Sequence, residues 1–478
     1  MGSASLQFVF FGLATAIVSN LSRSRAWRSL VLFAATVVFI ALIDRNPPSL
    51  VPLAGFLLAG YACLLLLGRG FRRLLAFFVV AMIFLYIWLK KYTFLPESGF
   101  LHFSYFSLGL SYIFFRVLHV LIETGEGGER KKIGLGAYLL YTLNFTTFIS
   151  GPIQRYDDFA RDQFAEEPIP LDVCVIGLQT ERILRGFFKV NVLAMLLYGV
   201  REEALIEIGQ PQSHSLMFLA ALRLAIVYPL FLYANFSGYI DIVIALARLM
   251  RVRSPENFDR PFSASSFIDF WSRWHITLSA WLKTYVYNPL LMALMRRASS
   301  VAIEPFLVVF SFFVTFFLVG LWHGRTSEFI FFGVLQGGGV AINKLWQLML
   351  ARVLGRKGYK ALAKNSLYAA VGRGLTYTWF SFTLFWFWSN WIEIEALYRS
   401  AGVRGWVGVW FTVWLLATTV LALWEWLRAA LLSIRTADGP VLTSRYALTA
   451  YASAMGLAVF VLTVLLSQPA PDIVYKAF

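Results

Sequence analysis

The sequence predicts an all-α integral membrane protein built from many membrane-embedded helices. Of its 478 residues, 59% are hydrophobic and only 14% are charged, and the mean hydropathy is +0.68. A soluble fold of this length cannot bury so much apolar surface. Apolar runs recur along the chain, and no alternating barrel strands are visible. At about 20 apolar residues per span, we expect about 11–13 embedded segments in one membrane domain, residues 1–478.

The basic residues lie in short loops between apolar runs, although the formal net charge is +16. Such loops are typical of the cytoplasmic side, beside anionic lipid, so membrane lipids are the expected partner and nucleic acid is not. The two cysteines, Cys63 and Cys174, match no metal or disulfide spacing, and no metal site is expected. The loop cations are Arg23, Arg25, Arg28, Arg69, Arg72, Arg73, Arg352, Arg356, Lys357, Lys360 and Lys364.

Residues 1–100 are predicted to form four scaffold helices without chemistry. The apolar segments lie near 5–19, 29–43, 50–67 and 74–89. No positive charge precedes the first, so we expect a retained helix and not a cleaved signal peptide. The cations in the loops that follow the first and third segments place the N-terminus outside the cytoplasm.

Polar residues become frequent from Leu101 onward. The run 102–123 carries serines, Arg116 and His119, and we expect the helix after it to end at Gly151-Pro152. Polar groups and broken helices at membrane depth require a protein or water-lined surrounding, which predicts a polar chamber.

Two further segments belong to this polar region. Residues 171–199 are predicted to be amphipathic, lying at the interface or lining a cavity. Residues 215–250 are long enough for a tilted span and contain Asp241, an acid in an uncharged run. Asp241 is either a functional residue or the buried partner of an arginine.

Residues 257–324 contain two of the five histidines, His275 and His323, each directly after a tryptophan. An imidazole at the end of a membrane-length apolar run is costly to bury, and it can act as a general base near neutral pH. The alternative is a histidine that is only hydrogen-bonded in the core. In 267–295 the spacing puts His275 on one helical face with Trp271, Trp274, Leu278 and Leu282, away from an Asp269–Arg273 pair.

The remaining segments are predicted to be spans. Residues 305–322 and 326–350 lead to a basic cytoplasmic loop, 351–364, and three more apolar segments lie near 375–391, 406–430 and 446–466. With that loop inside, His323 lies toward the outer end of its helix and His275 starts from the inner side. Two histidines reached from opposite faces suit a channel between two compartments.

The segment from about Leu101 to Trp346 resembles the membrane-bound O-acyltransferase (MBOAT) family, bacterial branch, which holds the alginate O-acetylation protein and the D-alanyl transfer protein of teichoic acid modification. The resemblance divides the chain into N-terminal scaffold helices (1–100), an MBOAT-like core (101–350) and the basic loop with the C-terminal helices (351–478). The matching motifs are ISGPIQRYDDF (149–159), GFFKVNVLA (186–194), NFSGYIDIVIALARLM (235–250), PENFDRPF (255–262), FWSRWHITLSAWLKTYVY (270–287) and GLWHG (320–324).

The resemblance implies that His323 is catalytic and that His275 lines the reaction chamber. It implies transfer of an acetyl or D-alanyl group from a cytoplasmic thioester, acetyl-CoA or an acylated carrier protein, to hydroxyls of a cell-envelope polymer. The donor is a co-substrate and not a permanently bound cofactor. Expected partners are that soluble donor or carrier and an extracytoplasmic acyltransferase, and the expected location is the inner membrane, as a multi-pass protein. Further chamber candidates are Trp322, Trp274, Trp271, Asn235, Ser237, Asp241 and Arg155.

The residues favour direct transfer over a covalent enzyme intermediate. No cysteine lies in the motif region around the histidines, and no GxSxG motif occurs. His323 can take the proton of the attacking hydroxyl, while His275, Ser237 or Asn235 holds the acceptor or stabilises the oxyanion. The alternative is a transporter or flippase of an envelope precursor without acyl chemistry, although no inverted repeat is visible.

Overall fold

The computed structural model describes residues 5–127, 133–210, 213–298, 300, 302–436, 439–440 and 444–466. Its elements are helices, apart from one antiparallel pair of two-residue strands, β1 (Arg435–Thr436) and β2 (Gly439–Pro440). The predicted all-α class is therefore confirmed.

Eight helices in the described part of the chain are long and apolar enough to span a membrane. The sequence predicted about 11–13 embedded segments at about 20 apolar residues each. Two further apolar helices in the described residues, Leu6–Ser19 and Ala447–Val461, are shorter than these eight. The eight are Arg25–Ile43, Pro47–Gly68, Arg72–Leu89, Val173–Ile208, His214–Leu249, Glu304–His323, Ser327–Val353 and Trp391–Ser433.

The chain divides into two compact units that interleave in sequence. Of the described residues, the first unit contains those up to Val190 together with Phe236–Glu256, and the second contains Asn191–Asn235 together with those from Asn257 onward. Two elements belong partly to each unit, the π-helix η5 (Lys189–Leu193) and the long helix α10 (His214–Leu249).

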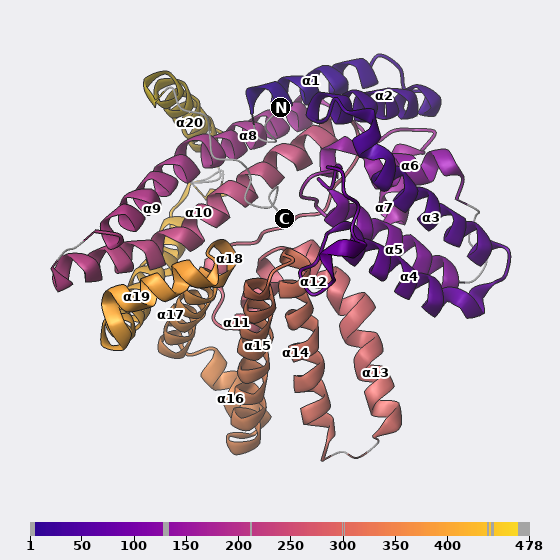
Figure 1. Cartoon of the computed structure of the whole chain (residues 1–478). Helices are drawn as coiled ribbons and strands as arrows, with labels where there is room; N and C mark the ends of the chain where they lie inside the picture. The colour runs from indigo at the N-terminus through magenta and orange to yellow at the C-terminus, as the bar shows by residue number, and fades with distance from the viewer. Residues whose placement is uncertain are drawn as a thin grey trace. The chain divides into compact units, whose positions relative to one another are not determined.

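The first unit contains the four predicted scaffold helices, and Figure 1 shows α3, α4 and α5 lying side by side. Its core is made of fully buried aromatic side chains such as Phe8, Phe39 and Phe56. Its elements are α1 (Leu6–Ser19), α2 (Arg25–Ile43), η1 (Pro47–Leu50), α3 (Val51–Gly68), η2 (Arg72–Leu74), α4 (Leu75–Leu89), η3 (Glu97–Gly99), α5 (Leu110–Glu126), α6 (Leu135–Leu143), η4 (Phe145–Thr147), α7 (Tyr156–Gln163) and α8 (Val173–Phe188).

The helix that we expected to end at Gly151-Pro152 ends earlier, at Leu143. Asn144 breaks it and caps the short helix η4, because its side-chain oxygen accepts the Thr146 N–H at 3.2 Å. Arg116, which is buried, donates to the Thr142 carbonyl at 2.8 Å and to the Thr147 carbonyl. The guanidinium thus satisfies backbone oxygens that the break would leave unpaired.

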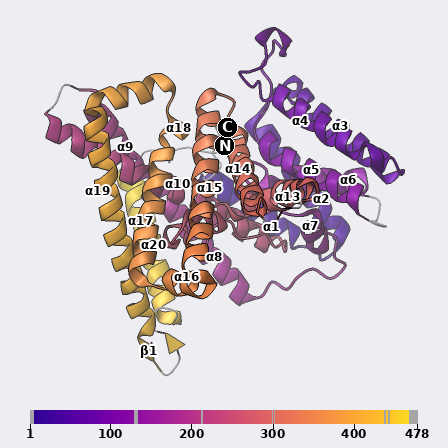
Figure 2. The same ribbon diagram turned by 90° about the horizontal axis from the view of Figure 1, so that it is seen from below.

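The second unit contains the membrane spans that the sequence predicted in the C-terminal half of the chain. The prediction that residues 351–364 form a loop is wrong in one respect, because Gly355–Ala363 is helical. The predicted segment 171–199 is also longer than expected, because its helix continues to Ile208. Figure 2 shows α17 and α19 side by side. The elements are α9 (Ala194–Ile208), η6 (Pro261–Ser263), α11 (Phe267–Arg273), α12 (Ile276–Leu282), η7 (Lys283–Tyr287), α13 (Asn288–Arg297), α14 (Glu304–His323), α15 (Ser327–Val353), α16 (Gly355–Ala363), α17 (Ser366–Thr383), α18 (Phe385–Trp388), α19 (Trp391–Ser433) and α20 (Arg445–Leu466).

Figure 1 shows α14 and α15 side by side. Glycines lie at their contact. A Cβ added to Gly320 would lie 2.2 Å from the Gly333 Cα, and one added to Gly333 would lie 2.5 Å from the Phe317 carbonyl oxygen. Small residues let two helix backbones approach this closely in a membrane. The contact fixes the end of α14, where His323 lies.

We predict that Gly333→Ala lowers the thermal stability of the detergent-solubilised protein, since overpacking costs about 1–3 kcal/mol. The matched control is Gly338→Ala on the same helix, where an added Cβ meets nothing within 4 Å. Fluorescence-detected size-exclusion chromatography after a heat step measures both variants. Equal melting of the two variants would show that the Gly320–Gly333 contact does not limit stability.

Candidate active site

The chain breaks between Trp274 and Ile276, and His275 lies at the break. Helix α11 ends at Arg273 and α12 begins at Ile276, while His275 adopts a left-handed conformation with φ 46° and ψ 52°. The prediction of one continuous helical face through Trp271, Trp274 and His275 is therefore wrong. A non-glycine residue in this conformation costs about 1–2 kcal/mol and persists only where its surroundings hold it.

A neighbouring segment, residues 257–259, pairs with the backbone at this break. Phe258 and Trp274 form an antiparallel bridge. The Asp259 N–H donates to the Arg273 carbonyl at 2.9 Å, and the Ile276 N–H donates to the Asn257 carbonyl at 3.0 Å. These bonds satisfy backbone groups that the interrupted helix leaves open.

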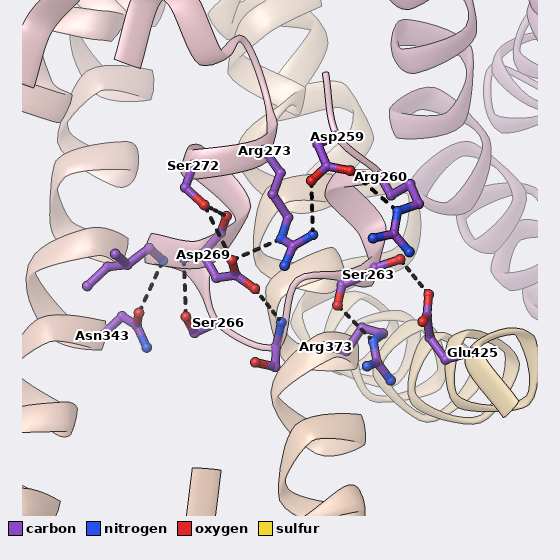
Figure 3. A network of polar contacts seen from close by, with 12 residues as sticks. Asp259, Arg260, Ser263, Ser266, Asp269, Ser272, Arg273, Asn343, Arg373 and Glu425 are labelled. Atoms are coloured by element: carbon purple, nitrogen blue, oxygen red, sulfur yellow. Dashed lines mark hydrogen bonds and ion pairs between the residues drawn. The ribbon is translucent and has the colours of Figure 1, made fainter. Parts of the chain in front are cut away.

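A polar network anchors α11 in front of the break (Figure 3). The predicted Asp269–Arg273 pair is present, with 2.9 Å between Oδ1 and Nε. From α15, the Asn343 side-chain oxygen accepts the Ile268 N–H at 3.2 Å. Ser266 caps the helix, Ser263 contacts Glu425, and Arg373 donates to the Ser263 carbonyl. α11 is thus fixed to α15, and the short helix η6 before it is fixed to α17 and α19.

The His275 side chain is completely buried. Its Nδ1 lies 3.3 Å from the Asn257 Oδ1. The residue lies between α11 and α12, outside the candidate spans, and burial lowers its pKa from 6.5 to about 3. The imidazole is therefore neutral at pH 7 and available as a base or hydrogen-bond partner.

His323 is the last residue of α14 and is 3% exposed. Its ring centroid lies 5.1 Å from that of Phe387 and 6.0 Å from that of Phe332. The Trp322 ring contacts both imidazoles, with centroid distances of 4.7 Å to His323 and 6.0 Å to His275. The structure therefore brings together the two histidines that the sequence singled out, in one aromatic surrounding.

The other two tryptophans pack in the same buried cluster. Trp271 lies against Phe316 of α14 at 5.1 Å, and Trp274 stacks on Phe270 at 5.6 Å and contacts Phe380 of α17 at 5.1 Å. Both are at most 2% exposed. These contacts give them a packing role beside the histidines.

Asn235 and Ser237 are both buried on α10. Residues two apart on a helix point to different sides, so the two side chains do not face one common surface. Of the pair, only Asn235 belongs to the unit that contains the two histidines.

Asp241 lies in an ion-pair cluster of the first unit. Its carboxylate accepts from the Arg182 Nε at 3.0 Å and the Lys189 Nζ at 2.8 Å, and Arg185 approaches to 3.7 Å. Arg182 also binds the exposed Glu256. The arrangement matches the second of the two interpretations of Asp241, a buried partner for basic residues.

Arg155 belongs to a second polar cluster of that unit. Its side chain is 60% exposed and pairs with Glu123. Glu123 lies 3.6 Å from the Nδ1 of His119, whose Nε2 accepts the Tyr156 N–H at 3.0 Å. This cluster fastens the segment after Pro152 to α5.

Sequence reasoning missed Asn257 as part of the site. Its side-chain oxygen accepts from the Thr277 N–H at 3.1 Å and from the Thr277 hydroxyl at 2.9 Å, besides its contact with His275. The only signal was its place in the PENFDRPF motif, because its partners lie about 20 residues further along the chain.

These features define a multi-pass helical membrane protein in which two buried imidazoles, one at a helix end and one at a helix break, contact the same tryptophan. The chain belongs to the membrane-bound O-acyltransferase family, whose profile matches residues 73–365, more than half of the sequence. The resemblance seen in the motifs is thereby confirmed.

The names of three relatives refer to three different polymers. The chain is 31% identical over 286 residues to a "Teichoic acid D-alanyltransferase" of Streptococcus thermophilus, covering 56% of this chain and 65% of that one. It is 32% identical over 237 residues to a "Probable alginate O-acetylase AlgI" of Pseudomonas syringae, covering 50% and 42%. It is 29% identical over 209 residues to a "Peptidoglycan O-acetyltransferase" of Helicobacter pylori, covering 44% and 37%. The matches span less than two thirds of each relative's length.

We predict that Asp241→Asn destabilises the protein by about 1.5–3 kcal/mol, because it weakens the charge-assisted hydrogen bonds of the carboxylate to the half-buried Arg182 and Lys189. The control is Glu256→Gln, since the Glu256 side chain is 60% exposed and such a pair contributes about 0–1 kcal/mol. Thermal melting in detergent compares the two. A stable but inactive Asp241→Asn protein would instead assign Asp241 to the chemistry.

Proposed function

We propose that this protein is an O-acyltransferase that moves an acetyl or D-alanyl group from a cytoplasmic thioester to hydroxyls of a cell-envelope polymer. One observation carries the proposal: His323, at the end of α14, and His275, at the break between α11 and α12, share Trp322 as a neighbour. Family membership and the acyl groups in the relatives' names support this choice over transport alone. A bacterial inner membrane is the location that fits such a substrate.

In the proposed reaction His323 is the general base. Its neutral imidazole takes the proton of the acceptor hydroxyl as the oxygen attacks the thioester carbonyl. The tetrahedral intermediate collapses with cleavage of the C–S bond, and the imidazolium returns the proton to the leaving thiolate. The products are an ester and a free thiol, without oxidation or reduction.

The position of His323 at a helix C-terminus suits this role. The carbonyl end of α14 carries partial negative charge, which favours the imidazolium that forms during proton transfer. Such an interaction contributes about 0.3–1 kcal/mol at exposed sites and up to about 2 kcal/mol where partly buried.

The positions of the two cysteines favour direct transfer between two bound substrates. Cys63 and Cys174 lie outside the segments that carry the histidines. A cysteine acyl-enzyme is therefore not part of the proposal, and the acyl group passes from donor thioester to acceptor in one complex. An extracytoplasmic acyltransferase partner could take up the product of this step.

Donor binding is proposed on the basic surface of residues 352–364. Its cations Arg352, Arg356, Lys357, Lys360 and Lys364 are exposed on the end of α15, on α16 and just after it. The positive-inside distribution supports a cytoplasmic location for this surface, where it would attract an acidic carrier protein or the phosphates of coenzyme A.

We predict that His323→Ala lowers acyl transfer by about 10²–10⁴-fold in proteoliposomes while the protein stays folded, because the base is lost. Release of free thiol from an acyl thioester in the presence of the acceptor polymer measures the rate. His102→Ala, which removes an exposed histidine, is the control and keeps the wild-type rate. Activity of His323→Ala within a few-fold of wild type would remove His323 from the mechanism.

We predict that reversing Arg352, Arg356 and Lys357 to glutamate weakens donor binding and reduces its dependence on salt, since the attraction is screened. Donor KM at several salt concentrations gives the readout. Arg399→Glu with Arg404→Glu on α19 serves as the control, and accessibility labelling checks that the topology is retained. With topology intact, an unchanged donor KM at every salt concentration would exclude this surface.

A further inference from the structure

The orientation of the Asn257 side-chain amide is fixed by its surroundings. The residue is completely buried, and one of its terminal atoms lies 3.1 Å from the Thr277 backbone nitrogen. A backbone N–H can only donate, so the atom that faces it must be the amide oxygen and not the NH2 group. This settles the choice between oxygen and nitrogen on chemical grounds.

The same oxygen faces the imidazole of His275, with 3.3 Å between the Asn257 Oδ1 and the His275 Nδ1. An amide oxygen has no hydrogen to give, so the hydrogen of this contact belongs to Nδ1. A neutral imidazole carries one N–H. The Nε2 of His275 therefore carries the lone pair.

We propose that Asn257 is a positioning residue that holds His275 in the Nδ1-protonated tautomer, so that His275 meets the acceptor hydroxyl as a hydrogen-bond acceptor through Nε2. The assignment of a hydroxyl as the ligand rests on the proposed function, whereas the tautomer does not. Of the two roles that the sequence left open for His275, this selects holding the acceptor. A nitrogen with a lone pair and no hydrogen cannot donate to an oxyanion.

The geometry gives Asn257 more than a capping role. Its oxygen caps the start of α12 through Thr277, a task that needs no contact with an imidazole. The Asn257 main-chain oxygen already fixes the backbone beside His275 through Ile276. The side chain also determines which ring nitrogen carries the hydrogen. A hydrogen-bond partner on one ring nitrogen fixes the tautomer of a histidine in this way.

The test is 15N NMR of the protein labelled at histidine, in which protonated and unprotonated ring nitrogens differ widely in chemical shift. Subtracting the spectrum of His275→Ala from that of the other proteins assigns the His275 signals among the five histidines. The wild type should show Nδ1 protonated and Nε2 unprotonated. A wild-type His275 with the hydrogen on Nε2 overturns the inference without need of any variant.

Three variants separate positioning from folding. Asn257→Leu should give a mixture of tautomers and lower kcat on the order of 10–10²-fold, the range seen when the hydrogen-bond partner of a metal-binding histidine is lost. Asn257→Asp keeps an acceptor oxygen and should retain the Nδ1-protonated signal. Asn343→Ala removes another side-chain amide that accepts a backbone N–H of α11, and it should leave the His275 signals unchanged.

The outcomes distinguish this inference from the proposed function. An unchanged His275 tautomer in folded Asn257→Leu overturns the positioning role, whatever the activity. A shifted tautomer in a protein that transfers no acyl group from any thioester leaves the positioning role standing and contradicts the proposed function. If Asn257→Leu fails to fold, the wild-type and Asn257→Asp spectra still decide the tautomer. A rise in the acceptor KM of Asn257→Leu, at constant donor KM, is expected from the hydroxyl role, and an unchanged acceptor KM contradicts it.

Discussion

The structure of the site depends on the hydrogen-bond partners that the backbone N–H and carbonyl groups find where the helix breaks at His275. Inside a membrane protein an unpaired N–H or carbonyl costs several kcal/mol, so an interrupted helix survives only with a partner. Residues 257–259 provide that partner by pairing with Trp274 and its neighbours. The left-handed backbone of His275, its burial and its contact with Asn257 all follow from this pairing.

The two histidines reach their common surroundings by different physical means. His275 is placed by a strained turn between short helices, whereas His323 is carried at the end of a spanning helix whose depth is set by the glycine contact with α15. One imidazole is tied to an amide that fixes its hydrogen, and the other lies among aromatic rings at a helix C-terminus. This difference suits the two proposed roles, in which His275 binds a hydroxyl and His323 takes its proton.

Much of the fold could be predicted from the length of the apolar runs, whereas the site could be predicted only in part. The N-terminal helices, α14 and α15 lie where the sequence predicted them, as does the Asp269–Arg273 pair. The break at His275 escaped prediction because α11 and α12 each keep helical spacing, and the interruption depends on a segment 18 residues earlier. The early end of α6 depends on Asn144 and on a distant Arg116, which local periodicity cannot reveal. Asp241 was ambiguous in the sequence because its partners lie on another helix, α8, and the π-helix after it.

The central claim is that this chain places ester-linked acyl groups on an envelope polymer. Mass spectrometry of envelope polymers from cells with the protein, without it, and complemented with the wild-type chain tests that claim most directly. The account predicts that one class of acyl ester disappears on deletion and returns on complementation. An identical content of acyl esters in all three cultures would contradict it.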